Sequence, residues 1–121
     1  MIKNVPNNVC VLYGIKNCDT VRKARKWLEA QDVEYTFHDV RSDGLDKKDL
    51  SAWVTSVGWE VLLNRRGTTW RQLPEKDKDT INETNAIQLM LAHPALIKRP
   101  VLIHKKITHV GFKPEKYETL F

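Results

Sequence analysis

Cys18 is the residue whose chemical type and position point most directly to chemistry. It lies between a short apolar run at residues 9–13 and a segment at residues 17–31 with the apolar spacing of a helix. Backbone N–H groups at a helix start lack partners within the helix and carry roughly half a positive charge, which favours a thiolate over a thiol. The sequence therefore predicts Cys18 as a nucleophile.

The charged residues near Cys18 act in opposite directions. Lys16 and Arg22 favour a thiolate, and Arg22 follows one helical turn later on the same face. Asp19 suits the start of a helix but opposes a negative charge on the neighbouring sulfur. A free cysteine is also commonly a small buried hydrophobic residue, so a place in the core is the alternative for Cys18.

The second cysteine, Cys10, falls inside the predicted first strand. About four strand residues at roughly 3.3 Å each separate it from the loop that carries Cys18, whereas a disulfide requires Cα atoms no more than about 7 Å apart. We therefore expect Cys10 in the core and Cys18 without a nearby resolving thiol. The two cysteines and four histidines show no metal-binding spacing such as C-x2-C, so no metal site is predicted.

The composition sets the class of protein that positions Cys18. The chain of 121 residues is 41% hydrophobic and 29% charged, which predicts a single soluble domain of residues 1–121. No apolar run approaches the roughly 18 residues of a membrane helix, and residues 1–8 hold no apolar signal segment. With only two cysteines, these features predict a cytoplasmic protein with no membrane partner. The formal charge of +5 permits nucleic-acid binding but equally fits a small enzyme for an anionic substrate.

Hydrophobic periodicity and turn residues predict the surrounding elements. Strands are expected at residues 9–13, 34–38, 101–104 and 107–110, and helices at residues 17–31, 46–57 and 84–93 and from Pro114 onward. The first strand, helix and second strand imply a right-handed parallel crossover, and the short turn at Lys105 implies antiparallel pairing of the last two strands. This order predicts an α/β fold with a mixed four-stranded sheet.

The segments between these elements have weaker signals. Residues 65–71 are expected to form a loop, and residues 75–79 a solvated surface. The residues expected in the core of the helical segments are Trp27, Trp53, Trp59, Ile87, Met90 and Leu91. Trp70 stands beside three arginines, so a place in a ligand groove is an alternative for this residue.

Three segments resemble the arsenate reductase (ArsC)/Spx family, most closely its YffB-like branch. They are LYGIKNCDT at residues 12–20, LLNRRGTTW at residues 62–70 and IKRP at residues 97–100. The resemblance runs from about residue 9 to the C-terminus, and it implies a thioredoxin-like fold with a helical insertion at about residues 45–94. It also implies that Cys18 is the nucleophile, that Arg99 binds an oxyanion, and that Pro100 is cis beside the thiol.

Two positions depart from the reductases of that family. Where those enzymes carry a second substrate arginine, this chain has Asn64, with Arg65 and Arg66 next to it, and Lys113 falls near the third such position. A lysine is a point charge and cannot hold an oxyanion with a planar fork. The resemblance with these departures therefore implies a reductase that is poorly suited to arsenate.

The leading hypothesis is a thiol-dependent oxidoreductase with Cys18 as its nucleophile, no bound cofactor, and glutathione or another small thiol or disulfide as its partner. Because no C-x-x-C partner exists, an external thiol must resolve the mixed disulfide. The side chains expected to bind the carboxylates of glutathione are Arg22, Arg66, Arg99 and Lys113. The alternatives are an exposed residue at a strand start for Arg99 and a plain surface charge for Arg66.

The second hypothesis is a Spx-like regulator without enzymatic activity that contacts RNA polymerase. The family resemblance includes such regulators, many of which carry a second thiol three residues after the first. Here that position is Val21, which favours the enzyme. Direct binding to nucleic acid is a third hypothesis that rests on net charge alone.

Overall fold

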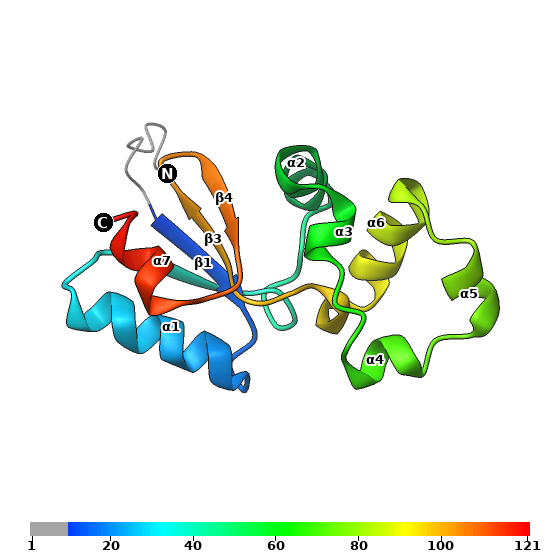
Figure 1. The fold of residues 1–121 in the computed structure, drawn as a ribbon, viewed down its shortest axis with the longest axis horizontal. Coiled ribbons are helices and arrows are strands. Elements are labelled where there is room, and N and C mark those ends of the chain that lie inside the picture. The colour runs from blue at the N-terminus through cyan, green and yellow to red at the C-terminus, as the bar shows by residue number, and fades with distance from the viewer. Residues whose placement is uncertain (1–9) are drawn as a thin grey trace. The chain divides into compact units, whose positions relative to one another are not determined.

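The computed structural model describes residues 10–121 and divides them into two compact units (Figure 1). The sheet unit comprises residues 10–43 and 99–121, and the helical unit comprises residues 44–98. Cys18 and Arg99 belong to the sheet unit, whereas Asn64, Arg65 and Arg66 belong to the helical unit. The organisation of the whole chain as one domain stays a prediction.

The sheet unit is built on four strands in the order β2-β1-β3-β4. They are β1 (Cys10–Gly14), β2 (Thr36–Asp39), β3 (Val101–His104) and β4 (Ile107–Val110). Strand β2 runs parallel to β1, while the β1–β3 and β3–β4 pairs are antiparallel. This confirms the predicted mixed four-stranded sheet. Strand β2 begins two residues later than predicted, and Val9 lies outside the described residues.

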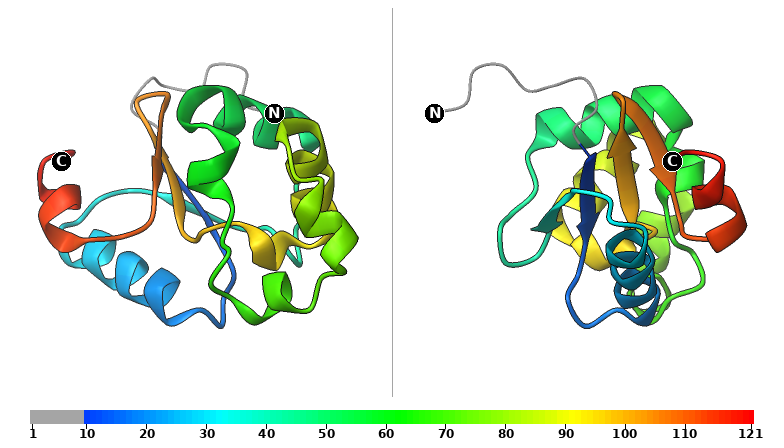
Figure 2. Two further views of the ribbon diagram at one scale, coloured as in Figure 1. Left: turned by 45° about the vertical axis from the view of Figure 1, so that its right-hand side comes forward. Right: turned by 90° about the vertical axis from the view of Figure 1, so that its left-hand side faces the viewer.

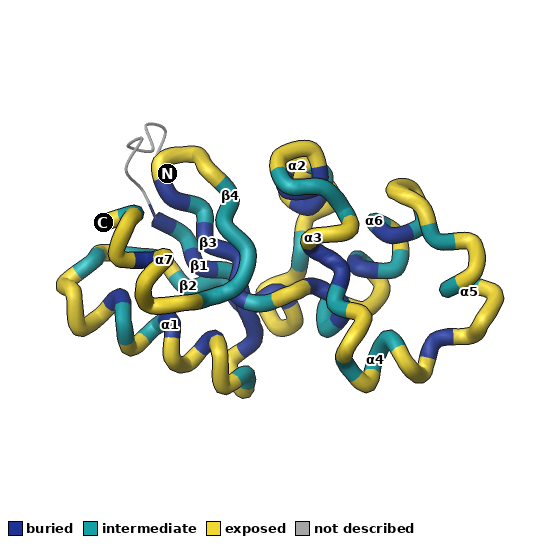
Figure 3. The backbone as a smooth tube through the Cα atoms, viewed as in Figure 1, coloured by how far each residue is buried: buried dark blue, intermediate teal, exposed yellow. Residues whose placement is uncertain are grey.

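Two helices cover one face of this sheet, α1 (Asp19–Ala30) and α7 (Pro114–Glu118) (Figure 2). Their shared core contains Cys10, Leu12, Ala24, Leu28, Leu102 and Tyr117, each at most 3% exposed. Trp27 is half-buried against this core, and its ring meets Tyr117 edge-on at 5.6 Å. Buried residues follow β1 and β3, while the outer side of α1 is exposed (Figure 3). The predicted place of Cys10 in the core is confirmed.

The helical unit contains six helical segments. They are α2 (Lys47–Val57), α3 (Trp59–Leu62), α4 (Thr68–Arg71), α5 (Glu75–Asp79), α6 (Glu83–Ala92) and the 3-10 turn η1 (Pro94–Leu96). The start of α2 is capped as the sequence indicates, because the Asp46 carboxylate accepts the Lys48 N–H at 3.0 Å. Gly58 ends α2 with a φ of 91°, a conformation that glycine adopts without a steric penalty.

Short helices replace two segments for which the sequence predicted irregular structure. Helix α4 lies within the predicted loop at residues 65–71, and α5 covers the predicted solvated segment at residues 75–79. A single helical turn is too short to show a periodic apolar stripe in the sequence. Leu73, between α4 and α5, is buried in the helical unit and anchors both short helices by its packing. No helix among residues 10–121 is long and apolar enough to cross a membrane.

The core of the helical unit differs in part from the predicted one. Trp53 is buried as expected, but Trp59 is only half-buried. On α6, Met90 is fully buried as predicted, while Ile87 and Leu91 are half-buried and Ala86 is fully buried. The fully buried stripe of α6 consists of Ala86 and Met90 and is therefore narrower than predicted.

Candidate active site

Cys18 occupies the N-cap of α1, at the end of a tight turn that follows β1. The Cys18 N–H donates to the carbonyl of Ile15 at 3.1 Å, and the Cys18 carbonyl accepts the N–H of Arg22 at 3.0 Å. The first bond closes the turn and the second begins the helix. The thiol is half-buried. The predicted position of Cys18 at a helix start is confirmed.

Gly14 allows the end of β1 to lie directly against the first turn of α1. A Cβ atom at residue 14 would stand 2.7 Å from Val21 Cγ2 and 2.9 Å from Val21 Cγ1. Val21 is fully buried, so it has little room to move. The turn that carries Cys18 thus depends on the absence of a side chain at Gly14.

Asp39, at the end of β2, ties this turn to the neighbouring loop. Its carboxylate is only 4% exposed, and it accepts backbone N–H groups from Lys16 at 3.1 Å, Arg41 at 2.8 Å and Ser42 at 3.0 Å. Burial alone would raise the pKa of Asp39, but these hydrogen bonds outweigh burial and lower it. The ionised carboxylate therefore fixes the backbone two residues before Cys18.

Sequence reasoning missed Asp39, although a signal for it exists. The parallel register pairs Gly14 with Asp39, so an acidic residue at the end of the second strand lies beside the turn after the first. That inference needs the exact register of the two strands. The predicted strand ended at His38, one residue too early.

The surroundings of Cys18 favour its thiolate. Partial burial alone would raise the pKa of the thiol. The N–H of Val21, the guanidinium of Arg99 through a hydrogen bond and its charge, and the N–H of Thr20 together outweigh burial and lower the pKa below its ordinary value. The N–H groups of Thr20 and Val21 point toward the sulfur, but neither forms a regular capping hydrogen bond with it. The surroundings of Cys18 therefore favour the thiolate, which is the nucleophilic form of cysteine.

Arg99 reaches the thiol from the segment that leads into β3. Its side chain is half-buried, and the Arg99–Pro100 peptide bond is cis, as the family resemblance implied. Pro100 itself is buried. The contact with Cys18 distinguishes Arg99 from the alternative of a merely exposed residue at a strand start.

The other predicted anion-binding residues lie in different surroundings. Arg22 is paired with the Asp19 carboxylate and also donates to the carbonyl of Lys16 at 3.5 Å. Lys113 is exposed at the N-cap of α7, and Arg66 is exposed in the helical unit. Their joint role in binding one ligand with Cys18 stays a prediction.

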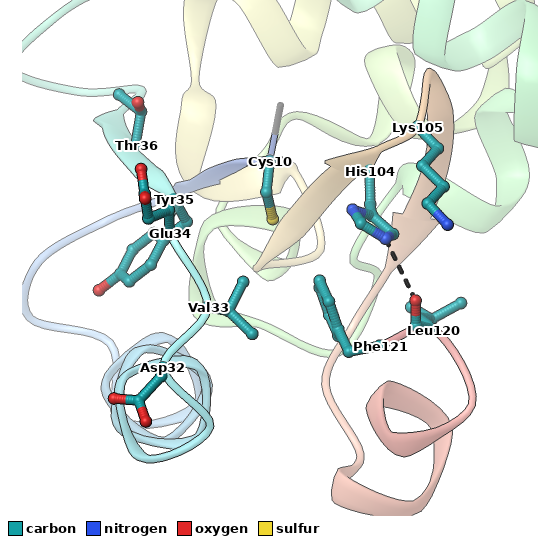
Figure 4. Close-up of a pocket in the computed structure, with 10 residues that line it drawn as sticks. All are labelled: Cys10, Asp32, Val33, Glu34, Tyr35, Thr36, His104, Lys105, Leu120 and Phe121. Atoms are coloured by element: carbon teal, nitrogen blue, oxygen red, sulfur yellow. Dashed lines mark hydrogen bonds between the residues drawn. The ribbon is translucent and has the colours of Figure 1, made fainter. Parts of the chain in front are cut away.

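A cavity of about 970 Å³ lies at the Cys10 end of β1, whereas Cys18 follows the other end of that strand (Figure 4). Cys10 and His104 line it, and the His104 ring is hydrogen-bonded to the carbonyl of Leu120 at 3.1 Å. Burial raises the pKa of the Cys10 thiol to about 11, so this thiol is protonated at neutral pH. Cys18 and this cavity are therefore separate features.

No group of three or more His, Cys, Asp or Glu side chains is placed to hold a metal ion within residues 10–121.

Three features together are those of a thioredoxin-like protein. They are a mixed sheet, a cysteine with a lowered pKa at the first helix start, and a cis-proline that follows an arginine in contact with the thiol. The profile of the ArsC family matches residues 13–120. The chain therefore belongs to the ArsC family.

Known proteins agree with this membership. The solved structure of the YffB (PA3664) protein is 50% identical, covers 93% of this chain and 98% of its own, and superposes with a TM-score of 0.88. An uncharacterized protein of Haemophilus influenzae is 44% identical over 91% of this chain and 96% of its own length. The global transcriptional regulator Spx of Streptococcus agalactiae is 28% identical over 87% of this chain and 77% of its own length. The predicted ArsC/Spx family and its YffB-like branch are confirmed.

Proposed function

We propose that this chain is a glutathione-dependent thiol reductase in which Cys18 is the nucleophile. The observation that supports the proposal is the lowered pKa of Cys18. Burial would raise this pKa, but the backbone N–H groups and the Arg99 guanidinium lower it by more. The thiolate is the form of cysteine that attacks a disulfide sulfur. A thiol held in this form at a helix start suits thiol–disulfide exchange.

The proposed reaction has two exchange steps. The Cys18 thiolate attacks one sulfur of a disulfide between glutathione and a substrate, so that a Cys18–glutathione disulfide forms and the substrate leaves as a thiolate that takes a proton from water. A second glutathione, as its thiolate, then attacks the glutathione sulfur of this mixed disulfide. Oxidised glutathione leaves and the Cys18 thiolate is restored. In sum, the substrate–glutathione disulfide and one free glutathione thiol become the substrate thiol and one molecule of oxidised glutathione.

Arg99 has two tasks in this scheme. Its guanidinium stabilises the Cys18 thiolate before attack, and its fork of N–H donors suits a carboxylate of glutathione once the sulfur has become neutral in the mixed disulfide. Lys113 and Arg22 are proposed to add positive charge toward the second carboxylate. Asp39 acts as a positioning residue, because it holds the backbone of Lys16 in the turn before Cys18.

The electrons in this scheme come from glutathione, so the reaction requires no bound cofactor. Glutathione is maintained in its thiol form in reducing compartments. We therefore place the proposed activity in the cytoplasm, with a small glutathione-containing disulfide as the substrate class.

A second candidate function is a regulator that binds the transcription machinery, with RNA polymerase as the partner. The relatives named Spx, which are 28% identical over 87% of this chain, support it. The residue three positions after Cys18 opposes it, because that residue is Val21 and is fully buried. A cysteine-pair redox switch is therefore missing at that position.

A coupled assay separates the two functions. Reduction of a cysteine–glutathione disulfide by glutathione is followed through the formation of oxidised glutathione, for the natural chain, Cys18→Ser and Cys10→Ser. We expect turnover that Cys18→Ser abolishes and Cys10→Ser retains. No turnover above the Cys18→Ser level, together with stable binding to purified RNA polymerase, would favour the regulator.

A further inference from the structure

A small cavity of about 230 Å³ lies within the helical unit, away from any residue assigned above to thiol chemistry except Arg66. Its lining consists of Glu60, Leu63, Arg65, Arg66 and Lys98. Three of these side chains are cationic and one is acidic. Every lining residue belongs to the helical unit, so a ligand could bind in this cavity whether or not Cys18 has the activity proposed above.

The backbone that forms the base of the cavity is firmly held. Residues 62–64 and 96–98 pair through two backbone hydrogen bonds of 2.7 Å each, from Asn64 to Leu96 and from Lys98 to Leu62. Leu63 and Ile97 face each other across this antiparallel bridge and are 2% and 1% exposed. The pairing fixes Lys98 beside the segment that continues into Arg65 and Arg66.

Arg65 is an exposed residue whose guanidinium lies close to two aromatic rings. Its guanidinium carbon lies 5.5 Å from the centre of the Trp59 ring and 5.6 Å from the centre of the Trp70 ring. Both distances are within the range of cation–π attraction. A guanidinium that meets aromatic rings in this way can still direct its N–H edge at an oxygen pair. Arg65 is therefore positioned before any ligand arrives, which lowers the entropic cost of binding.

The main chain of Arg66 is fixed from two sides. The Asn64 carboxamide oxygen accepts the Arg66 N–H at 3.1 Å, and the Arg71 guanidinium donates to the Arg66 carbonyl at 3.1 Å. Asn64 thus shapes the turn that presents both arginines. The side chain of Arg66 remains exposed at the cavity.

The cations of the cavity outnumber its carboxylates, because Arg65, Arg66 and Lys98 line it together with a single acidic residue, Glu60. The ion pairs found within residues 10–121 join Arg22 to Asp19 and Lys78 to Glu75, so neither neutralises a cation of the cavity. Glu60 lowers the net positive charge but leaves the cations in excess. Three cations gathered on a fixed backbone favour an anion that can contact more than one of them.

We propose that this cavity binds a compact dianion, with Arg65 contacting two of its oxygens and Arg66 and Lys98 supplying charge. Carboxylate and phosphate groups both present the oxygen pair that a guanidinium edge matches. The volume of about 230 Å³ suits a ligand of a few heavy atoms, because pockets for larger ligands usually exceed about 300 Å³. The ligand class is therefore a small dicarboxylate or a phosphate group.

The test is an NMR titration of the full chain, labelled with 15N, with succinate and separately with inorganic phosphate at pH 7.5 and constant ionic strength. We expect saturable shifts at the Arg65 side-chain N–H and at the backbone amides of residues 63–67 and 98. Arg65→Lys keeps the charge but loses the fork, so we expect about tenfold weaker binding. Lys98→Gln should weaken binding about threefold, as for an exposed charge contact.

Lys105→Gln is the matched control, because Lys105 is an exposed cation in the sheet unit. This variant should bind like the natural chain. Saturation by either anion supports the proposal, and the anion that saturates at the lower concentration identifies the source of the dianion. Shifts that rise without saturation for both anions, or unchanged binding by both Arg65→Lys and Lys98→Gln, would overturn it.

Discussion

The Asp39 carboxylate accepts the backbone N–H of Lys16 at 3.1 Å. This hydrogen bond joins the end of β2 to the turn that precedes Cys18. Both oxygens of this buried carboxylate accept backbone N–H groups, since Arg41 and Ser42 bind the second one. This buried carboxylate therefore holds the backbone of the turn that leads to Cys18. This relationship makes Asp39 the clearest structural support of the site.

Asp39→Asn should destabilise the chain and slow the reaction of Cys18. An amide in place of the carboxylate directs its NH2 group at one or more backbone donors, and each lost hydrogen bond to a charged group costs about 1.5 to 3 kcal/mol. Chemical unfolding measures the loss, and the rate of alkylation at Cys18 measures the displaced turn. Asp32→Asn is the control, since Asp32 is exposed with a φ of 55° that asparagine also adopts.

The pH dependence of stability gives an independent readout of Asp39. Its pKa in the folded state is lowered relative to the unfolded chain, so its contribution is fully present above the unfolded value of about 3.9 and is lost as the pH falls through the folded value. The stability difference between the natural chain and Asp39→Asn should be constant near neutral pH and shrink in acid. A difference that grows in acid would contradict this role.

Gly14→Ala should displace the start of α1, because the added Cβ would meet both methyl groups of Val21 at 2.7 and 2.9 Å. Overpacking of this kind costs about 1 to 3 kcal/mol of unfolding free energy. The double variant Gly14→Ala with Val21→Ala removes the opposing methyl groups. It should therefore be more stable than the sum of the two single effects predicts. Strict additivity of the three measured unfolding free energies would refute the steric explanation.

The sequence predicted the parts of the fold that depend on local pattern. The apolar run before Gly14 and the helical spacing after Cys18 placed Cys18 correctly at the N-cap of α1. Asp39 escaped prediction because its function depends on the register between β1 and β2, which no local pattern specifies. Helices α4 and α5 escaped because one-turn helices depend on tertiary packing more than on periodicity.

The structure places the residues predicted to bind anions in different surroundings. The family resemblance implied that Arg99 binds an oxyanion, and the structure places its guanidinium against the Cys18 thiol. Arg22 was expected to support the thiolate through helical spacing, but its charge is shared with Asp19. Spacing places two residues on one face of a helix, yet it does not reveal which nearby partner a flexible side chain selects.

Arsenate reduction should be weak or absent. A compact tetrahedral oxyanion held over a thiolate requires bidentate guanidinium contacts for both charge and orientation. The family position of a second substrate arginine is Asn64, whose carboxamide oxygen is engaged by the Arg66 N–H at 3.1 Å. We expect arsenate turnover far below the turnover of a cysteine–glutathione disulfide in parallel coupled assays. Efficient arsenate turnover would show that another cation replaces the missing arginine.

Arg99→Lys should raise the KM for a glutathione-containing disulfide more than it lowers the melting temperature. The lysine retains the positive charge near Cys18 but loses the planar fork proposed to hold a glutathione carboxylate. A loss of about 1.5 kcal/mol in binding corresponds to roughly a tenfold rise in KM. Lys23→Gln, at an exposed position of α1, is the control. Early unfolding with an unchanged KM would assign Arg99 a structural role instead.

The pKa of Cys18 decides whether this helix start stabilises a thiolate. It is measured as the pH dependence of the alkylation rate, with the modified residue identified by mass spectrometry. We predict a pKa below the ordinary thiol value of about 8.5, and a rise toward that value in Arg99→Gln, because the neutral side chain no longer stabilises the thiolate. Cys10 should remain unmodified near neutral pH, since burial raises its pKa to about 11. A Cys18 pKa at or above about 8.5, or one that Arg99→Gln leaves unchanged, would contradict the account.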